Sequence, residues 1–530
     1  MLQLMRNRNF QSIALLFYTM TLGMTQELPP YTSADPQNLL PLESTHVVSG
    51  SEGLSKNIRP WVNVDTSNEF KFNSFLTTRA IYNDNVPNME NTAELWVGKG
   101  INHFTTFHID FYNSYFLLSV EPYFLFAQNK TFESHHVVRD RSVYNPTIVW
   151  KYNVLNDGPG RGSGNVNELG LRETQLYVHY EGLGMGLSNA GMWWGPGIHT
   201  SLNMSTNTSG FPHLVLGTMR EKRWRQFGYQ FRYILGELNQ NKTKPYLTAL
   251  LGELTFYNEP TISMGAIRTI LSGGTYDPDV SFLHAALVPF QSFFKKSLFE
   301  SSDEEDPVEL YDIDDQTASL YISFLFPREK LKIFLEYGWD DHRWDWYDLR
   351  AHPDHSGASI IGLRKSGLFH YQQLFFGFEY ANLSKSPFYP HRESPDWYTK
   401  KEFFYSTNDG RRYAAHSGSD SDDMLIYLAW VDEIRSIQLS FNYERHGIVY
   451  SVQLLDITNA FHFPETKLEF QFNYKQVWGL GELWMYYEFE YTENLGSPAQ
   501  LIHPHVERPE RKANVFGLGY SIDLISQFGN

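Results

Sequence analysis

In one block of the sequence, residues 336–365, aromatic and charged side chains alternate closely enough to form a ligand-binding site. It reads EYGWDDHRWDWYDLRAHPDHSGASIIGLRK. Flat aromatic faces can stack on the apolar C–H patches of a sugar ring, while charged groups hydrogen-bond its hydroxyls. The residues of this block that we assign to polysaccharide binding are Trp339, Asp341, Arg343, Trp344, Trp346 and Asp348. An aromatic girdle at a membrane interface, with its charges in solvent, is an equally good interpretation of the same pattern.

Other chemistry is poorly supported by the residues present. His352, Asp354 and His355 could ligate a divalent cation, but a suitably spaced third histidine is missing, so we expect no metal site and no cofactor. The chain contains no cysteine, which excludes thiolate ligands, cysteine nucleophiles and disulfides. Neither Gly-x-Ser-x-Gly nor His-Glu-x-x-His occurs, and we expect no catalytic residues and no enzyme activity.

A second candidate site is the stretch GMWWGPGIHTSLNMS, residues 191–205, in which two tryptophans precede a sharp turn. Proline fixes φ and glycine permits positive φ, so the chain must kink beside the indoles, and we expect a positive φ at Gly197. Trp193 and Trp194 either anchor a loop as a packed pair or project into a lumen or its mouth and contact polysaccharide. The structural turn consists of Gly195, Pro196 and Gly197.

The amino-acid composition limits the classes of protein in which these candidate residues can lie. The 530 residues include 39 Phe, 33 Tyr and 13 Trp, yet the formal net charge is −17. That acidic balance argues against nucleic acid as a partner. Residues 1–25, with Arg6 and Arg8 before an apolar stretch, read as a signal peptide cleaved before Gln26. Beyond it, no apolar run is long enough for a transmembrane helix.

Segments of alternating polarity recur along the rest of the chain. Between Thr466 and Lys475, Leu468, Phe470 and Phe472 alternate with charged and amide side chains, and 173–180 and 437–444 show the same period of two. Further candidate strands lie at 103–111, 228–235, 319–326, 331–337, 371–380, 483–491 and 514–524. A soluble β protein would show the same alternation. Aromatic apolar faces opposite charged faces instead favour a transmembrane barrel with a wet lumen.

We therefore predict an all-β fold in three parts. Residues 1–25 are the signal peptide, residues 26–90 form a small N-terminal periplasmic region, and residues 91–530 form a transmembrane antiparallel β-barrel of about 18 strands. The predicted location is the outer membrane of a Gram-negative cell, with outer-membrane lipid around the barrel.

Three motifs in a shared order resemble the Wzi family of outer-membrane capsule-assembly proteins. They are WWGPG with the following SLNMSTNTSGFPHLVLGT, the 336–365 block with its Glu-x-Gly, Pro-Asp-His and Gly-Leu-x-Lys elements, and EYANLSKSPFYPHRESPDWYTKK. The resemblance covers most of residues 95–500. It implies a barrel of about 18 strands with an N-terminal helical periplasmic region, acting as a surface lectin that helps to attach capsular polysaccharide and not as an enzyme.

The resemblance implies partners, and the barrel pattern leaves a rival function open. The expected ligand is an extracellular or capsular polysaccharide, and the polysaccharide export machinery is a further candidate partner. A porin for small solutes or saccharides would share the barrel, the girdle and the charged lumen, but it requires an open path through the lumen.

Overall fold

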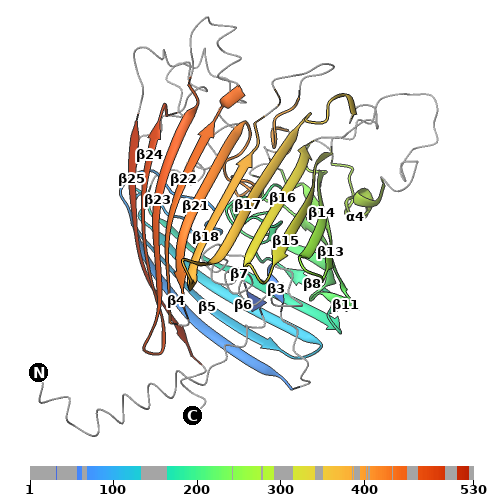
Figure 1. Ribbon diagram of the computed structural model, residues 1–530, viewed down its shortest axis with the longest axis horizontal. Coiled ribbons are helices and arrows are strands. Elements are labelled where there is room, and N and C mark those ends of the chain that lie inside the picture. The colour runs from blue at the N-terminus through green and yellow to red at the C-terminus, as the bar shows by residue number, and fades with distance from the viewer. Residues whose placement is uncertain are drawn as a thin grey trace, which may run out of the picture.

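The computed structural model describes the chain in segments: 31–32, 57–62, 69–132, 164–240, 243–275, 278–291, 314–340, 350–384, 386, 394–400, 403, 406–432, 434–449, 463–495 and 510–524. In these segments, eighteen antiparallel strands close into a barrel (Figure 1). Closure is made by the last strand and the first, which pair from Val515 opposite Asn83 to Asp523 opposite Phe75. The predicted fold class is therefore confirmed. The predicted signal peptide lies outside the described residues.

Each wall strand pairs with its neighbours along the chain, and two short strands, β10 and β11, follow one another on the same edge of β12. The wall consists of β4 (Lys71–Asn83), β5 (Gly100–Tyr112), β6 (Phe116–Ala127), β7 (Val166–Tyr180), β8 (Leu183–Ser188), β10 (His213–Thr218) with β11 (Lys222–Trp224), β12 (Phe227–Glu237), β13 (Tyr246–Phe256), β14 (Thr261–Ser272), β15 (Asp315–Phe326), β16 (Leu331–Asp340), β17 (Gly357–Leu368), β18 (Tyr371–Asn382), β21 (Ser421–Val431), β22 (Arg435–His446), β23 (Glu465–Trp478), β24 (Gly481–Glu493) and β25 (Arg511–Asp523).

The wall is apolar outside and polar inside. On β23, Phe470 is 43% exposed, whereas its neighbour Glu469 is buried. On β22, Leu439 and Phe441 are exposed and Asn442 is buried. A soluble β protein would bury the apolar face, so this inverted pattern is that of a barrel surrounded by lipid.

The connections at the two ends of the barrel differ in length. Two or three residues join β5 to β6, β17 to β18 and β23 to β24, whereas much longer segments join the strands at the other end, as Figure 1 shows. In outer-membrane barrels the short turns face the periplasm and the long loops face outward. The end of the barrel with the short turns therefore faces the periplasm, and the end with the long connections faces outward.

The barrel begins earlier in the chain than expected. Its first strand, β4, starts at Lys71, ahead of the predicted boundary at residue 91. The central residues Thr77, Thr78 and Arg79 are all polar, so they hide the alternation that marks the other strands. Part of the region predicted to be periplasmic is therefore barrel wall.

Several segments lie inside the barrel and pack on one another. We call them the luminal plug and define it as residues 57–60, 84–99, 189–212, 394–400 and 406–420. Most of their side chains are buried. The plug contains the short strands β2 (Ile58–Arg59) and β9 (Trp193–Trp194), which pair with each other, and β19 (Thr407–Asn408) and β20 (Arg411–Arg412), which form a hairpin. Two further short strands, β1 (Tyr31–Thr32) and β3 (Trp61–Val62), also pair.

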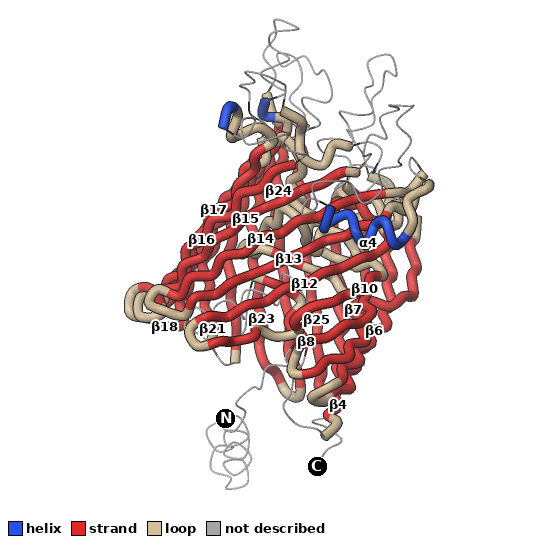
Figure 2. Tube along the Cα trace, turned by 90° about the vertical axis from the view of Figure 1, so that its right-hand side faces the viewer, coloured by secondary structure: helices blue, strands red, loops and turns tan. Residues whose placement is uncertain are grey.

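One helix, α4 (Phe282–Gln291), lies against the outer surface of the barrel, beside β13 and β14 (Figure 2). The Tyr233 hydroxyl donates to the carbonyl oxygen of Ala286, and the Thr248 hydroxyl donates to that of Ala285. Phe282 and Leu283 remain exposed on its free face. In the described segments, no helix is both long and apolar enough to cross a membrane.

Candidate functional site

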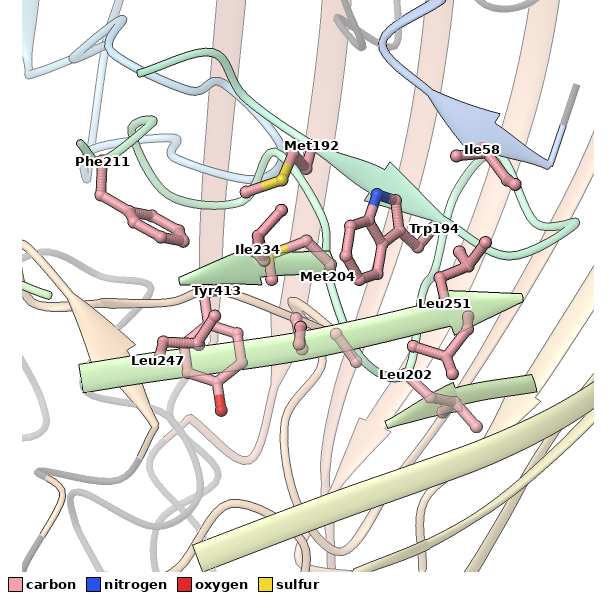
Figure 3. Packing of buried hydrophobic residues seen from close by; sticks show 14 of the residues in the cluster. Ile58, Met192, Trp194, Leu202, Met204, Phe211, Ile234, Leu247, Leu251 and Tyr413 are labelled. Carbon is pink, nitrogen blue, oxygen red and sulfur yellow. The ribbon is translucent and has the colours of Figure 1, made fainter. Parts of the chain in front are cut away.

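The two tryptophans before the turn are fully buried in the plug. Trp194 packs among Met192, Leu202, Met204 and Leu251 (Figure 3), and Trp193 belongs to a separate buried cluster. The Trp193 indole also donates to the carbonyl oxygen of a turn glycine, at 2.9 Å. This placement is that of a packed pair that anchors a loop. Contact with polysaccharide through these two indoles stays a prediction, which would require them to leave their present packing.

The Gly-Pro-Gly turn needs both glycines, but for different reasons. Gly195 has a φ of 114°, where side chains are strained, and a Cβ there would lie 2.6 Å from Glu336 Oε2. The positive φ that we predicted at Gly197 is wrong, because the left-handed position is Gly195. A Cβ at Gly197 would instead overlap the carbonyl oxygen of Thr200, so close backbone approach requires this glycine.

A wall carboxylate holds the chain just after the turn. Glu379 on β18 accepts hydrogen bonds from three consecutive backbone amides, those of Ile198, His199 and Thr200, at 2.9, 3.1 and 2.8 Å. Arg364 on β17 lies 3.5 Å from the same carboxylate and donates to the carbonyl oxygen of Pro196. Hydrogen bonds from backbone amides to an ionised acceptor are among the stronger ones, so this contact fixes the turn to the wall.

A segment from the N-terminal region lies directly against the turn. Arg59 donates to the carbonyl oxygen of Gly197 at 2.9 Å, and the carbonyl oxygen of Asn57 accepts from the Gly195 amide at 2.8 Å. The Asn57 side chain donates to the wall residue Glu253. Residues 57–60 thus lie within the lumen, although this part of the chain is predicted to be periplasmic.

Residues 394–400 tie the plug to the loop that follows β16. The Tyr398 hydroxyl donates to the carbonyl oxygen of Leu202, and its backbone amide donates to the Asp340 carboxylate at 2.7 Å. The Trp397 indole donates to the carbonyl oxygen of Ser356. Ser356 also accepts from the Asp340 amide, so these contacts clamp the two ends of the loop together.

The predicted aromatic and charged block is only partly described. Trp339 is half-buried and has the same parity as the exposed Ile333 and Leu335, so it faces outward from β16. Its ring lies 5.0 Å from that of Tyr337, as expected of a girdle. Trp339 therefore lies on the opposite side of the wall from Trp193 and Trp194. The other residues of the block, Asp341, Arg343, Trp344, Trp346 and Asp348, lie outside the described residues.

A small cavity lies beside the plug, towards the short-turn end. Its volume is about 180 Å³, and its lining includes Glu90 and His199 from the plug and Gln438 and Asn473 from the wall. Trp484 also contributes, with its ring stacked on a neighbouring tyrosine at 5.7 Å. Most of the residues that line this cavity are polar.

Two cationic side chains of the plug have shifted pKa values. Burial lowers the pKa of Arg412 to about 10. Burial alone would also lower the pKa of His416, but the hydrogen bond and charge of Asp423, with the charges of Glu90 and Glu444, raise it to about 9. Burial therefore dominates at Arg412, whereas the neighbouring carboxylates dominate at His416.

The residues weighed for metal binding do not form a compact donor set. His352 and His355 are buried, while Asp354 is exposed and lies 3.5 Å from His352. Among the described residues, the sets with ligand atoms within 4.8 Å of one another lie elsewhere and include His199, His416 and Asp423. Sequence analysis missed these three because they come from distant segments, and no local spacing marks them.

Comparison with known proteins places the chain in a family. The model of the family described as capsule assembly protein Wzi matches residues 84–493. The chain is similar in fold to Wzi of Escherichia coli, described as an outer membrane protein involved in group 1 capsule assembly and as a carbohydrate-binding β-barrel. The identity is 12% and the TM-score 0.56, over 93% of this chain and 98% of that one. Acinetobacter baumannii OccAB2 matches at 10% identity and a TM-score of 0.43, over 86% and 98% of the two chains. No curated protein matches.

Proposed function

The chain belongs to the Wzi family of capsule assembly proteins, and from this premise we propose that it binds extracellular or capsular polysaccharide at the loop-bearing end of its outer-membrane barrel. The polymer-binding residues that we propose are those that follow β16 in the aromatic and charged block: Asp341, Arg343, Trp344, Trp346 and Asp348. Outer-membrane lipid is the second proposed partner, because the outward side chains of the wall are apolar.

The observation that carries this proposal is the clamp at the base of the loop. Asp340 ends β16, and it is held both by the Ser356 carbonyl oxygen and by the amide of Tyr398. A loop with a fixed base presents its side chains with less loss of conformational freedom on binding. The proposed binding residues lie between two such fixed ends.

The alternative function, a porin, is less well supported by the lumen. A porin needs an open aqueous path, whereas the described plug segments pack across the lumen and bond to several wall strands. Glu379, Glu253 and Asp423 hold the plug from three different strands. Conductance in planar bilayers separates the two functions, since a plugged lectin should conduct poorly.

Substitution of the loop tryptophans tests the proposal. Stacking on single sugars gives modest affinity, but a polymer that engages several copies gains avidity. We expect Trp344→Ala and Trp346→Ala to move polymer from the cell surface into the medium without changing the total amount made. Trp478→Ala is the matched control, because this exposed tryptophan lies beside a short turn at the other end.

Folding must be verified for each variant by a heat-modifiable band on SDS gels and by surface labelling. Purified protein in detergent should bind polymer on a glycan array, and the two loop variants should lose that binding. Equal amounts of cell-bound polymer in folded loop variants and in the parent would refute the assignment and leave a structural girdle as the role of these residues.

A further inference from the structure

Two histidines and an aspartate from three separate segments meet inside the barrel. His199 follows the Gly-Pro-Gly turn, His416 lies in plug residues 406–420, and Asp423 lies on β21. His199 Nε2 is 3.2 Å from Asp423 Oδ1, and His416 Nε2 is 3.2 Å from Asp423 Oδ2. Donor atoms around a tetrahedral zinc ion, with bonds of about 2.0–2.1 Å, lie roughly 3.3 Å apart, so these spacings suit one cation.

A fourth donor is the side-chain amide of Asn442 on β22. Its Nδ2 lies 2.8 Å from His199 Nε2 and 2.5 Å from Asp423 Oδ1. The residue is 1% exposed, and Oδ1 accepts no hydrogen bond from the described part of the chain. As it stands, Asn442 Nδ2 donates to Asp423 Oδ1 and faces the site. A half-turn of the amide exchanges its oxygen and nitrogen, and Oδ1 then occupies that position, from which it can ligate a cation.

We propose that His199, His416, Asp423 and Asn442 bind one divalent transition-metal cation, with zinc as the best match to two imidazoles and two oxygen donors. Sequence analysis led us to expect no metal. The site is independent of the proposed polysaccharide contacts, which lie beyond the end of β16.

The surrounding charges identify which donors belong to the site. Glu90 and Glu444 also lie close to His416, but both are salt-bridged to Lys467, as is Glu469. A cation there would face the ammonium of Lys467. His416 Nε2 faces both groups, but it lies 3.2 Å from Asp423 Oδ2 and 3.9 Å from Glu90 Oε2, so the set around Asp423 is the better position for a cation.

The charge around the proposed ligands suits a divalent cation, because Glu90 and Glu444 lie close to His416 in addition to Asp423. Imidazole ligates such a cation in its neutral form. His199 also lines the cavity beside the plug.

A cation bound here would join two segments of the plug, residues 189–212 and 406–420, to the wall. His199 and His416 come from different parts of the plug, while Asp423 and Asn442 come from neighbouring strands, whose residues pair at Asp423 and Glu444. Since the metal binds only when these segments are docked, it should stabilise the docked plug.

Metal titration of the full-length, untagged protein in detergent tests this proposal. After treatment with EDTA and dialysis, we expect calorimetry to show binding of one Zn²⁺ per barrel. Co²⁺ in its place should give the visible absorption of a tetrahedral complex. Asp423→Asn and His416→Ala should abolish both signals, while His284→Ala, which removes an imidazole on the outer helix α4, should leave them intact.

Heat-modifiable migration on SDS gels must show that each variant is folded. Should the buried His416→Ala variant fail to fold, His199→Gln provides the test, because this side chain lines the cavity. Folded parent protein that binds no Zn²⁺ would overturn the proposal, as would binding that persists in the folded Asp423→Asn and His199→Gln variants. Loss of binding in His284→Ala alone would assign the metal to the outer surface and overturn the luminal site.

Discussion

Replacing Glu379 by alanine tests whether a wall carboxylate holds the Gly-Pro-Gly turn in the lumen. The substitution leaves the amides of Ile198, His199 and Thr200 without their acceptor, at about 1–3 kcal/mol for each buried donor. It also removes the carboxylate beside Arg364. Water that enters the vacated space would satisfy part of these groups. We therefore expect the docking of the plug to weaken by about 3–5 kcal/mol, as for other broken buried ion pairs.

Single-channel recording in planar bilayers measures this effect. Since each 1.4 kcal/mol is about tenfold, the undocked population should rise about a hundredfold or more, and openings should become frequent. Glu237→Ala is the control, because this carboxylate is half-exposed and pairs with Lys244 at the surface. We expect that variant to change stability by less than about 0.5 kcal/mol. A Glu379→Ala barrel that conducts no more than the control, with the same urea midpoint, would refute the reasoning.

Three further predictions concern the turn and the location of the protein. Gly197→Ala should lower the yield of folded barrel, because its Cβ would overlap the carbonyl oxygen of Thr200, whereas Gly252→Ala, with no atom within 4 Å, should not; equal yields would contradict the close approach. Trp194→Ala removes a fully buried indole and should cost about 3–5 kcal/mol in urea unfolding, and an unchanged midpoint would speak against its packing role. The mature chain should fractionate with outer membranes as a heat-modifiable band, and recovery as a soluble periplasmic protein would contradict that location.

The wall of the barrel could be predicted from the sequence because alternation is a local property. Phe470 and Glu469 differ in polarity, and the strand places them on opposite faces whatever its neighbours are. The strand β4 was missed because the polar run from Thr77 to Arg79 carries no such contrast. On β16, Trp339 has the same parity as the exposed Ile333 and Leu335. The alternation of this strand therefore indicates from the sequence alone that Trp339 faces outward.

The plug could not be predicted in the same way. Its contacts join residues far apart in the chain, such as Asn57 with Glu253 and Thr200 with Asp423. The hydrophobic periodicity around either residue of such a pair does not indicate where its partner lies. The Gly-Pro-Gly motif predicts a bend, but only the approach of Thr200 and Glu379 shows why the second glycine is needed.

The buried turn and the proposed surface loop are joined by a short chain of contacts, and this has a consequence for interpreting variants. Trp194 and Leu202 belong to one buried cluster. The carbonyl oxygen of Leu202 accepts from the Tyr398 hydroxyl, and the Tyr398 amide holds Asp340 at the base of the loop. A change at Trp194 can therefore displace the loop without any contact between the indole and a sugar. Loss of surface polymer in a Trp194 variant does not by itself place that residue in the binding site. Only a direct effect on sugar binding in Trp344 or Trp346 variants, with the clamp at Asp340 intact, separates contact from positioning.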